Sequence, residues 1–89
     1  MPRKKNEEKE KKIIQIIELI NLLLEDPKVP KNVKKALEDA KNRLSEKGDP
    51  TIRAGSAIYS ITEISNDVNL PVSARTMVWN ILSLLETIK

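Results

Sequence analysis

The sequence predicts an all-α fold of four antiparallel helices, arranged as two tandem helical hairpins in a four-helix bundle. Three observations lead to this prediction. Apolar residues recur at steps of three and four along most of the chain, which is the period of a helix. The pattern is broken at three places, each marked by proline or glycine. The 89 residues hold only one Trp, one Tyr and two Gly, and they fit one small domain.

The first helix is expected over residues 7–25, after a flexible basic arm "MPRKKN" at residues 1–6. Its apolar positions follow the helical period: Ile13, Ile16, Ile17, Ile20, Leu23 and Leu24. The run "IIQIIELINLLL" is not expected to cross a membrane, since Gln15, Glu18 and Asn21 interrupt it and a span needs about 20 apolar residues. The segment is therefore predicted to be the buried stripe of a soluble helix.

The second helix is expected over residues 30–46. The segment "DPKVP" ends the first helix, because the residue before a proline is driven out of the helical region. Pro30 suits the first helical position, where its missing N–H costs nothing. The positions expected to face inward are Val33, Leu37, Ala40 and Leu44.

The third and fourth helices are expected over residues 50–65 and 71–88. Between the second and third helices, Gly48 suits a left-handed cap and Asp49 suits an N-cap. The segment "NDVNLP" makes the last break, and Pro71 opens the final helix. The expected core positions are Ala54, Ala57, Ile58, Ile61, Ile64, Ala74, Met77, Val78, Ile81, Leu84, Leu85 and Ile88. Residues 7–89 then form a single helical domain.

The second half of the chain resembles the first. A shift of 41 residues lays residues 11–47 on residues 52–88, matching Asp26 with Asp67 and Pro30 with Pro71. A helix pair in each unit of about 40 residues is distantly similar to HEAT and armadillo repeats. Such solenoids need three or more units, so two units favour a compact bundle.

Three phrases of the sequence also resemble a known family: "EDPKVPKNVKKA", "IRAGSAI" and "EISNDVNLPVSARTMVWNI". Together they identify the chain as similar to an uncharacterised family of small archaeal helical proteins, over residues 13–88. The family pattern has a proline where this chain has Val68. The resemblance implies an all-helical cytoplasmic protein from an archaeon, and it carries no catalytic residues.

The composition argues against an enzyme. The chain has no Cys and no His, which excludes disulfides, thiolate nucleophiles and imidazole bases, and we expect no metal or cofactor. It contains no glycine-rich phosphate loop and no EF-hand loop. Asp26 and Asp67 occupy matching breaks, where aspartate typically stabilises turns. A chain without Cys also fits a reducing cytoplasm.

The difference between the two halves indicates a protein interface. Residues 1–47 carry 13 basic and 9 acidic side chains, whereas residues 48–89 carry 3 and 4. On the expected outer faces of the third and fourth helices lie Ile52, Tyr59, Val72, Arg75, Trp79 and Leu82. The matching residues of the first half are all charged: Lys11, Glu18, Lys31, Lys34, Glu38 and Lys41. A second apolar face predicts burial against a protein partner, most simply in a homodimer.

Three arrangements without a partner would also account for the second apolar face. In the first, the arm or the loop "SEKGDP" covers Trp79. In the second, the fourth helix is central in a splayed bundle, and in the third the ring lies flat on the surface.

A rival function is nucleic-acid or ribosome association through Lys28, Lys31, Lys34, Lys35 and the basic arm. These lysines cluster around the expected start of the second helix, where free N–H groups can bind anions. Two acidic residues follow the cluster closely, at positions 38 and 39, and no aromatic residue for base stacking lies near it.

Overall fold

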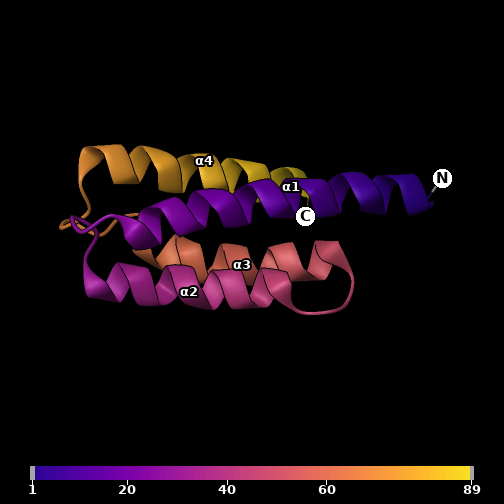
Figure 1. Ribbon diagram of the computed structural model, residues 1–89, viewed down its shortest axis with the longest axis horizontal. Coiled ribbons are helices and arrows are strands. Elements are labelled where there is room, and N and C mark those ends of the chain that lie inside the picture. Colours follow the sequence, from indigo (N-terminus) through magenta and orange to yellow (C-terminus); the bar gives the residue numbers. More distant parts are fainter. Residues whose placement is uncertain (1, 89) are drawn as a thin grey trace.

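In a computed structural model, the chain folds into four helices with no strand among the described residues (Figure 1). The structure describes the backbone of residues 2–88 and the side chains of residues 7–88. The helices are α1 (Pro2–Glu25), α2 (Lys31–Ser45), α3 (Pro50–Ile64) and α4 (Val72–Ile88). The predicted all-α fold of four helices is confirmed.

Successive helices run in opposite directions (Figure 1). The α1–α2 and α3–α4 turns lie together at one end of the bundle, and the α2–α3 loop lies at the other. Both α1 and α3 pack against α2 and α4, whereas no Cα atom of α2 comes within 8 Å of α4. The helices α2 and α4 therefore lie diagonally across a bundle whose extents are 43 × 19 × 19 Å.

A single apolar core runs between the four helices. The helices contribute Ile13, Ile16, Ile20, Leu23, Val33, Leu37, Ala40, Leu44, Ala54, Ala57, Ile61, Ile64, Ala74, Val78, Ile81, Leu85 and Ile88. Most predicted inward positions are buried in this core. The remainder lie half-buried at the margin of the core, because the apolar stripe of each helix is wider than the strip that neighbouring helices cover. They are Ile17, Leu24, Ile58, Met77 and Leu84.

The two turns at one end of the bundle form the same hydrogen bonds. In the first, Asp26 Oδ1 accepts from the Lys28 N–H at 2.9 Å, and in the second Asp67 Oδ1 accepts from the Asn69 N–H at 2.8 Å. The carbonyl of each Asp also accepts from the N–H three residues later, in both turns at 3.2 Å. That third residue is apolar and buried in each turn, at Val29 and Leu70. Both Asp residues therefore hold turns, as the sequence predicts.

The start of α1 differs from the expectation. We expected an arm over residues 1–6, but the helix already begins at Pro2 and includes residues 3–6. Proline is favourable in the first turn of a helix, and the Lys, Arg and Glu residues that follow have high helix propensity. The apolar period, which begins only at Ile13, gives no signal for this part of the helix.

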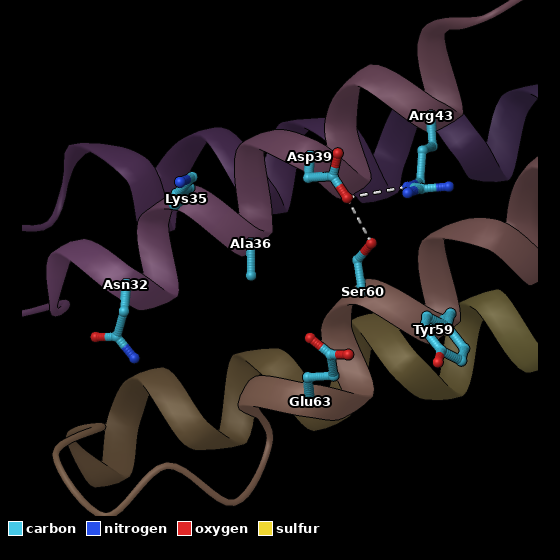
Figure 2. A pocket seen from close by; sticks show the side chains of 8 residues that line it. All are labelled: Asn32, Lys35, Ala36, Asp39, Arg43, Tyr59, Ser60 and Glu63. Atoms are coloured by element: carbon cyan, nitrogen blue, oxygen red, sulfur yellow. Dashed lines mark hydrogen bonds and ion pairs between the residues drawn. The ribbon is translucent and has the colours of Figure 1, made fainter.

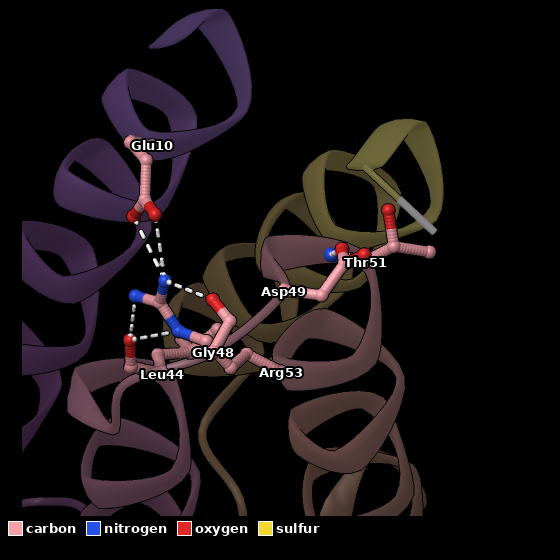
Figure 3. A network of polar contacts seen from close by, with 6 residues as sticks. All are labelled: Glu10, Leu44, Gly48, Asp49, Thr51 and Arg53. Atoms are coloured by element: carbon pink, nitrogen blue, oxygen red, sulfur yellow. Dashed lines mark hydrogen bonds and ion pairs between the residues drawn. The ribbon is translucent and has the colours of Figure 1, made fainter. Parts of the chain in front are cut away.

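A polar network joins the α2–α3 loop to α1 (Figure 3). Gly48 has a positive φ of 130°, and Asp49 Oδ1 caps α3 by accepting from the Thr51 N–H at 2.8 Å. Arg53 Nε donates to the Leu44 carbonyl at 3.0 Å, and its Nη2 donates to the same oxygen. Arg53 Nη1 contacts both carboxylate oxygens of Glu10, at 2.8 and 3.0 Å. One side chain thus caps the end of α2 and ties it to α1.

Candidate functional site

The outer faces of α3 and α4 expose four large side chains. The exposed fraction is 70% for Ile52, 74% for Tyr59, 78% for Val72 and 58% for Trp79. Isolated apolar residues are common on protein surfaces, but here they lie on two neighbouring helices that pack against each other. This outer surface is defined by Ile52 and Tyr59 on α3 and by Val72 and Trp79 on α4.

Leu82 and Arg75, which we also predicted for the interface, are half-buried. Leu82 packs against the apolar core at its margin. Arg75 donates from Nη2 to the Asp67 carbonyl at 3.1 Å, so it holds the α3–α4 turn as well as lying beside the outer surface. Its Nε atom is buried and has no hydrogen-bond partner.

Trp79 lies between two shallow hollows of the surface. One, of about 340 Å³, runs along α4 and is lined by Val72, Arg75, Thr76, Trp79, Asn80 and Ser83. The other, of about 270 Å³, reaches the end of α3 and is lined by Ser65, Asn66, Trp79, Leu82 and Ser83. The structure therefore places Trp79 beside Val72 and Arg75 in one hollow and beside Leu82 in the other.

Tyr59 borders two further hollows. The first, of about 400 Å³, lies on α3 and is lined by Gly55, Ile58, Tyr59, Thr62 and Glu63. A Cβ atom built on Gly55 would have no neighbouring heavy atom within 4 Å, so this glycine leaves open space above α3. We call this space the Gly55 hollow.

The second Tyr59 hollow, of about 380 Å³, lies between α2 and α3 (Figure 2). At its wall, Asp39 Oδ2 accepts from Arg43 Nε at 3.0 Å and from Ser60 Oγ at 2.8 Å. These hydrogen bonds, from Arg43 first and then from Ser60, hold the pKa of Asp39 below its ordinary value. The sequence reasoning missed this hollow, although Ser60, a polar residue within the buried stripe of α3, could have signalled it.

Asp67 links the α3–α4 turn to the start of α2. Its Oδ2 atom accepts from Asn32 Nδ2 at 2.8 Å, in addition to the Asn69 N–H that Oδ1 accepts within its own turn. The hydrogen bond from Asn32, followed by that from Asn69, lowers the pKa of Asp67. The role of this carboxylate is therefore structural: it stabilises the α3–α4 turn and holds that turn against the start of α2.

The structure excludes the α2–α3 loop as a cover for Trp79, and it excludes a splayed bundle with α4 at its centre. The described residues leave the ring 58% exposed, so neither the α2–α3 loop nor any other described segment covers it. Since α4 packs against α1 and α3 and not against α2, it is not the central helix of a splayed bundle. The side chains of residues 1–6, the expected arm, lie outside the described residues.

The four predicted anion-binding lysines lie around the start of α2. Lys28, Lys31 and Lys35 are exposed and Lys34 is half-buried. Pro30 occupies the N-cap position without a side-chain hydrogen bond to the helix. Within residues 7–88 the ion pairs are those of Arg43 and Arg53 with acidic residues, so no lysine of this cluster has an acidic partner there.

Metal sites and membrane spans find no support among the described residues. No group of three or more acidic residues gathers there in a way that could hold a metal ion. No helix in that part of the chain is sufficiently long and apolar to cross a membrane.

Comparison with known proteins places the chain in a family. The model of an uncharacterised protein family, UPF0147, matches residues 1–88. The chain belongs to the UPF0147 family. A UPF0147 protein of the archaeon Saccharolobus islandicus is 41% identical over 81 residues, which cover 90% of this chain and 91% of the relative. This confirms the resemblance to an uncharacterised archaeal family.

Two solved structures have the same fold as this UPF0147 chain. A crystal structure of a protein of unknown function superposes with a TM-score of 0.82 at 39% identity, covering 88% of this chain and 90% of the other. A crystal structure of a UPF0147 protein from Thermoplasma acidophilum gives a TM-score of 0.81 at 31% identity, covering 89% and 94%. The family is described only as uncharacterised, so its function has to be argued from the site.

Proposed function

We propose that this protein is a non-enzymatic interaction module that self-associates through the outer surface of α3 and α4. The observation that carries the proposal is the contrast between equivalent outer positions in the two halves of the bundle. The four apolar residues that define the outer surface are each more than half exposed. The equivalent positions on α1 and α2 are exposed too, but they hold charged residues: Lys11, Glu18, Lys31 and Glu38. The fold therefore does not require apolar side chains at these outer positions.

The chemistry of the surface favours a protein partner. Tyr and Trp contribute a large contact area at a small cost in conformational entropy, and they are enriched among the residues that dominate interface energies. The second half of the chain carries few charges, and charged residues are depleted at the centre of interfaces. A symmetric dimer buries the same surface on both copies and is the commonest oligomer of soluble proteins.

A catalytic role has no comparable support. The chain lacks Cys and His, and its two carboxylates with lowered pKa values, Asp39 and Asp67, are engaged in structural hydrogen bonds. A general acid or base has a pKa near the working pH, so a lowered carboxylate pKa points away from this use. The absence of Cys also fits the reducing cytoplasm, where we place the protein.

The proposal is tested by sedimentation velocity on the wild type and on Trp79→Glu, over concentrations from low to high micromolar. We expect the wild type to sediment as a dimer at the upper end and Trp79→Glu to remain a monomer with unchanged helix content. Glu38→Lys is the matched control, since it changes charge at the equivalent position of α2 and should leave the dimer intact. A wild type that stays monomeric throughout would refute self-association.

The rival function, binding of nucleic acid by Lys28, Lys31, Lys34 and Lys35, is favoured by one observation. The start of α2 has no side-chain cap, so its free N–H groups lie beside these lysines. Binding of this kind weakens steeply as salt rises and is lost when Lys31, Lys34 and Lys35 are replaced by alanine. Equal binding by that triple variant, or no binding at low salt, would remove this function.

A further inference from the structure

Two pairs of side chains on the outer surface have matching spacing. On α3, Tyr59 precedes Glu63 by four residues, which is about one helical turn. On α4, Trp79 follows Arg75 by the same step. In an α-helix, residues at this spacing lie above one another on the same face. Each helix thus presents one aromatic ring and one charged group, about one turn apart.

The two pairs are also level with each other along the bundle. Glu63 lies in the last turn of α3 and Arg75 lies in the first turn of α4, and these ends meet at the α3–α4 turn. Because α3 and α4 run in opposite directions, the aromatic residue lies farther from that turn in both helices (Figure 1). On each helix the charged residue therefore lies nearer the α3–α4 turn and the aromatic residue lies one turn farther along the bundle. The charged residue is an anion on α3 and a cation on α4.

The groups on both helices are available to contact a partner. Glu63 is exposed and forms no ion pair within residues 7–88. Arg75 has one hydrogen bond, from Nη2 to a turn carbonyl, and it lines the same hollow as Trp79. Beside Tyr59 and Glu63, the Gly55 hollow of about 400 Å³ is open. A projecting ring with a cation therefore lies on one helix, and a hollow with an anion lies on the other.

We infer that α4 of one copy packs antiparallel on α3 of a second copy, with Trp79 entering the partner's Gly55 hollow beside Tyr59 and Arg75 pairing with Glu63. A two-fold axis parallel to the bundle repeats this contact, so each copy provides one ring and one hollow. The inference rests on the proposed self-association and specifies how the surfaces match. Aromatic pairs and ion pairs of this kind give an interface its register as well as its affinity.

Gly55 offers the sharpest test, because a side chain there affects the dimer and the monomer in opposite ways. Leucine at this position meets no heavy atom within 4 Å of its Cβ in the monomer, and it is a much better helix former than glycine. In the dimer it fills the space that Trp79 would occupy, and it does so twice. We expect Gly55→Leu to raise the dimer dissociation constant about thirtyfold or more, with a monomer melting temperature equal to or above that of the wild type.

Trp79 reports this contact directly, since it is the only Trp in the chain. Entry of the indole into the partner's hollow should shift its fluorescence to shorter wavelength as the concentration rises. In Gly55→Leu the emission should stay at the long wavelength of an exposed ring over the same range.

The ion pair is tested by mixing two charge reversals. Glu63→Arg alone and Arg75→Glu alone each place like charges at both contacts of the dimer, so each should be monomeric. When the two variants are mixed, both contacts of the heterodimer again join opposite charges, because one chain carries two cations and the other two anions, so mixing should restore association. The double variant Glu63→Arg with Arg75→Glu provides a second rescue within one chain, because both contacts of its homodimer also join opposite charges.

We expect the double variant to form a dimer with a dissociation constant within about threefold of the wild type. Circular dichroism checks that the single and double variants are folded. If the variants that contain Arg75→Glu do not fold, the comparison of Gly55→Leu with the wild type still tests the inferred contact.

The outcomes separate this inference from the proposed function. A monomeric wild type overturns both. A wild-type dimer that Gly55→Leu leaves unchanged, or a folded double charge variant that does not associate, overturns only the arrangement inferred here. Loss of the dimer in Gly55→Leu and its recovery in the double charge variant support the arrangement.

Discussion

Replacement of Arg53 by methionine should destabilise the bundle far more than removal of the carboxylate that Arg53 contacts. Methionine keeps a similar apolar stem but cannot donate a hydrogen bond. The Arg53 side chain is only 12% exposed, whereas Glu10 is 45% exposed. The two partners of this ion pair therefore lie in different environments, and their contributions can be separated.

The magnitude follows from the partners of the guanidinium. Leu44 is fully buried and its carbonyl lies in the last turn of α2, where helical carbonyls lack a backbone partner. Loss of Arg53 removes a charged hydrogen-bond donor from that buried oxygen, which costs about 2 to 3 kcal/mol of unfolding free energy. The Glu10 contact is half in solvent, so Glu10→Gln should cost only about 0.5 to 1 kcal/mol.

The assay is urea unfolding followed by circular dichroism, at a concentration where the protein is monomeric. Arg43→Met is the matched control, because Arg43 forms an exposed ion pair with Asp39 and its loss should change stability very little. For a domain of this size we expect Arg53→Met to lower the melting temperature by roughly 10 to 20 °C. If Glu10→Gln proves as costly as Arg53→Met, the ion pair rather than the carbonyl cap carries the energy, and the reasoning fails.

Three further predictions concern single residues. Asp67→Ala should destabilise the protein more than Asp26→Ala, because Asp67 also accepts from Asn32, and chemical unfolding of both variants measures the difference. Because folding lowers the pKa of Asp39 and of Asp67, their ionised carboxylates stabilise the fold at pH values above the unfolded pKa near 3.8. This contribution is lost as the pH falls through the pKa values of the folded protein. Asp67→Asn should therefore show a smaller fall in melting temperature between about pH 5 and pH 2 than the wild type, and an equal fall would contradict the assignment. Gly55→Ala should raise the unfolding free energy of the monomer by about 0.5 to 1 kcal/mol, whereas a loss in urea unfolding would show that the space above α3 is not open.

The helices and their core could be predicted from the sequence because both follow from local periodicity. The buried residues of α2, for example, are those that the apolar period indicated: Val33, Leu37, Ala40 and Leu44. The breaks at proline and glycine also set the ends of α2 and α3 to within a residue or two. The early start of α1 was missed because its first turns hold no apolar residue apart from proline, so only helix propensity could have indicated them.

The polar contacts between helices could not be predicted in this way. Arg53 and Glu10 are 43 residues apart in the sequence, and Asn32 and Asp67 are 35 apart. Such pairs meet only after the bundle fixes the rotation and level of each helix. The same reason applies to Arg75: the helical period places it on the outer side of α4, but its side chain turns back to the Asp67 carbonyl.

The outer surface itself was predictable in part. Comparison of the two halves of the sequence indicated positions that the fold leaves outside, and four of the six proved exposed. What periodicity cannot supply is the shape between the side chains. The Gly55 hollow is a property of the folded chain alone, because an empty space above a glycine depends on every side chain around it.

Two exposed charged positions on α1 and α2 have a practical consequence for protein design. Glu18 and Glu38 occupy exposed positions equivalent to Tyr59 and Trp79, and neither contributes to the core. Aromatic residues introduced at these two positions would leave the interior packing unchanged and would give the bundle a second surface for self-association. A molecule with two such surfaces, facing different directions, would no longer close as a pair and would extend into a chain of copies.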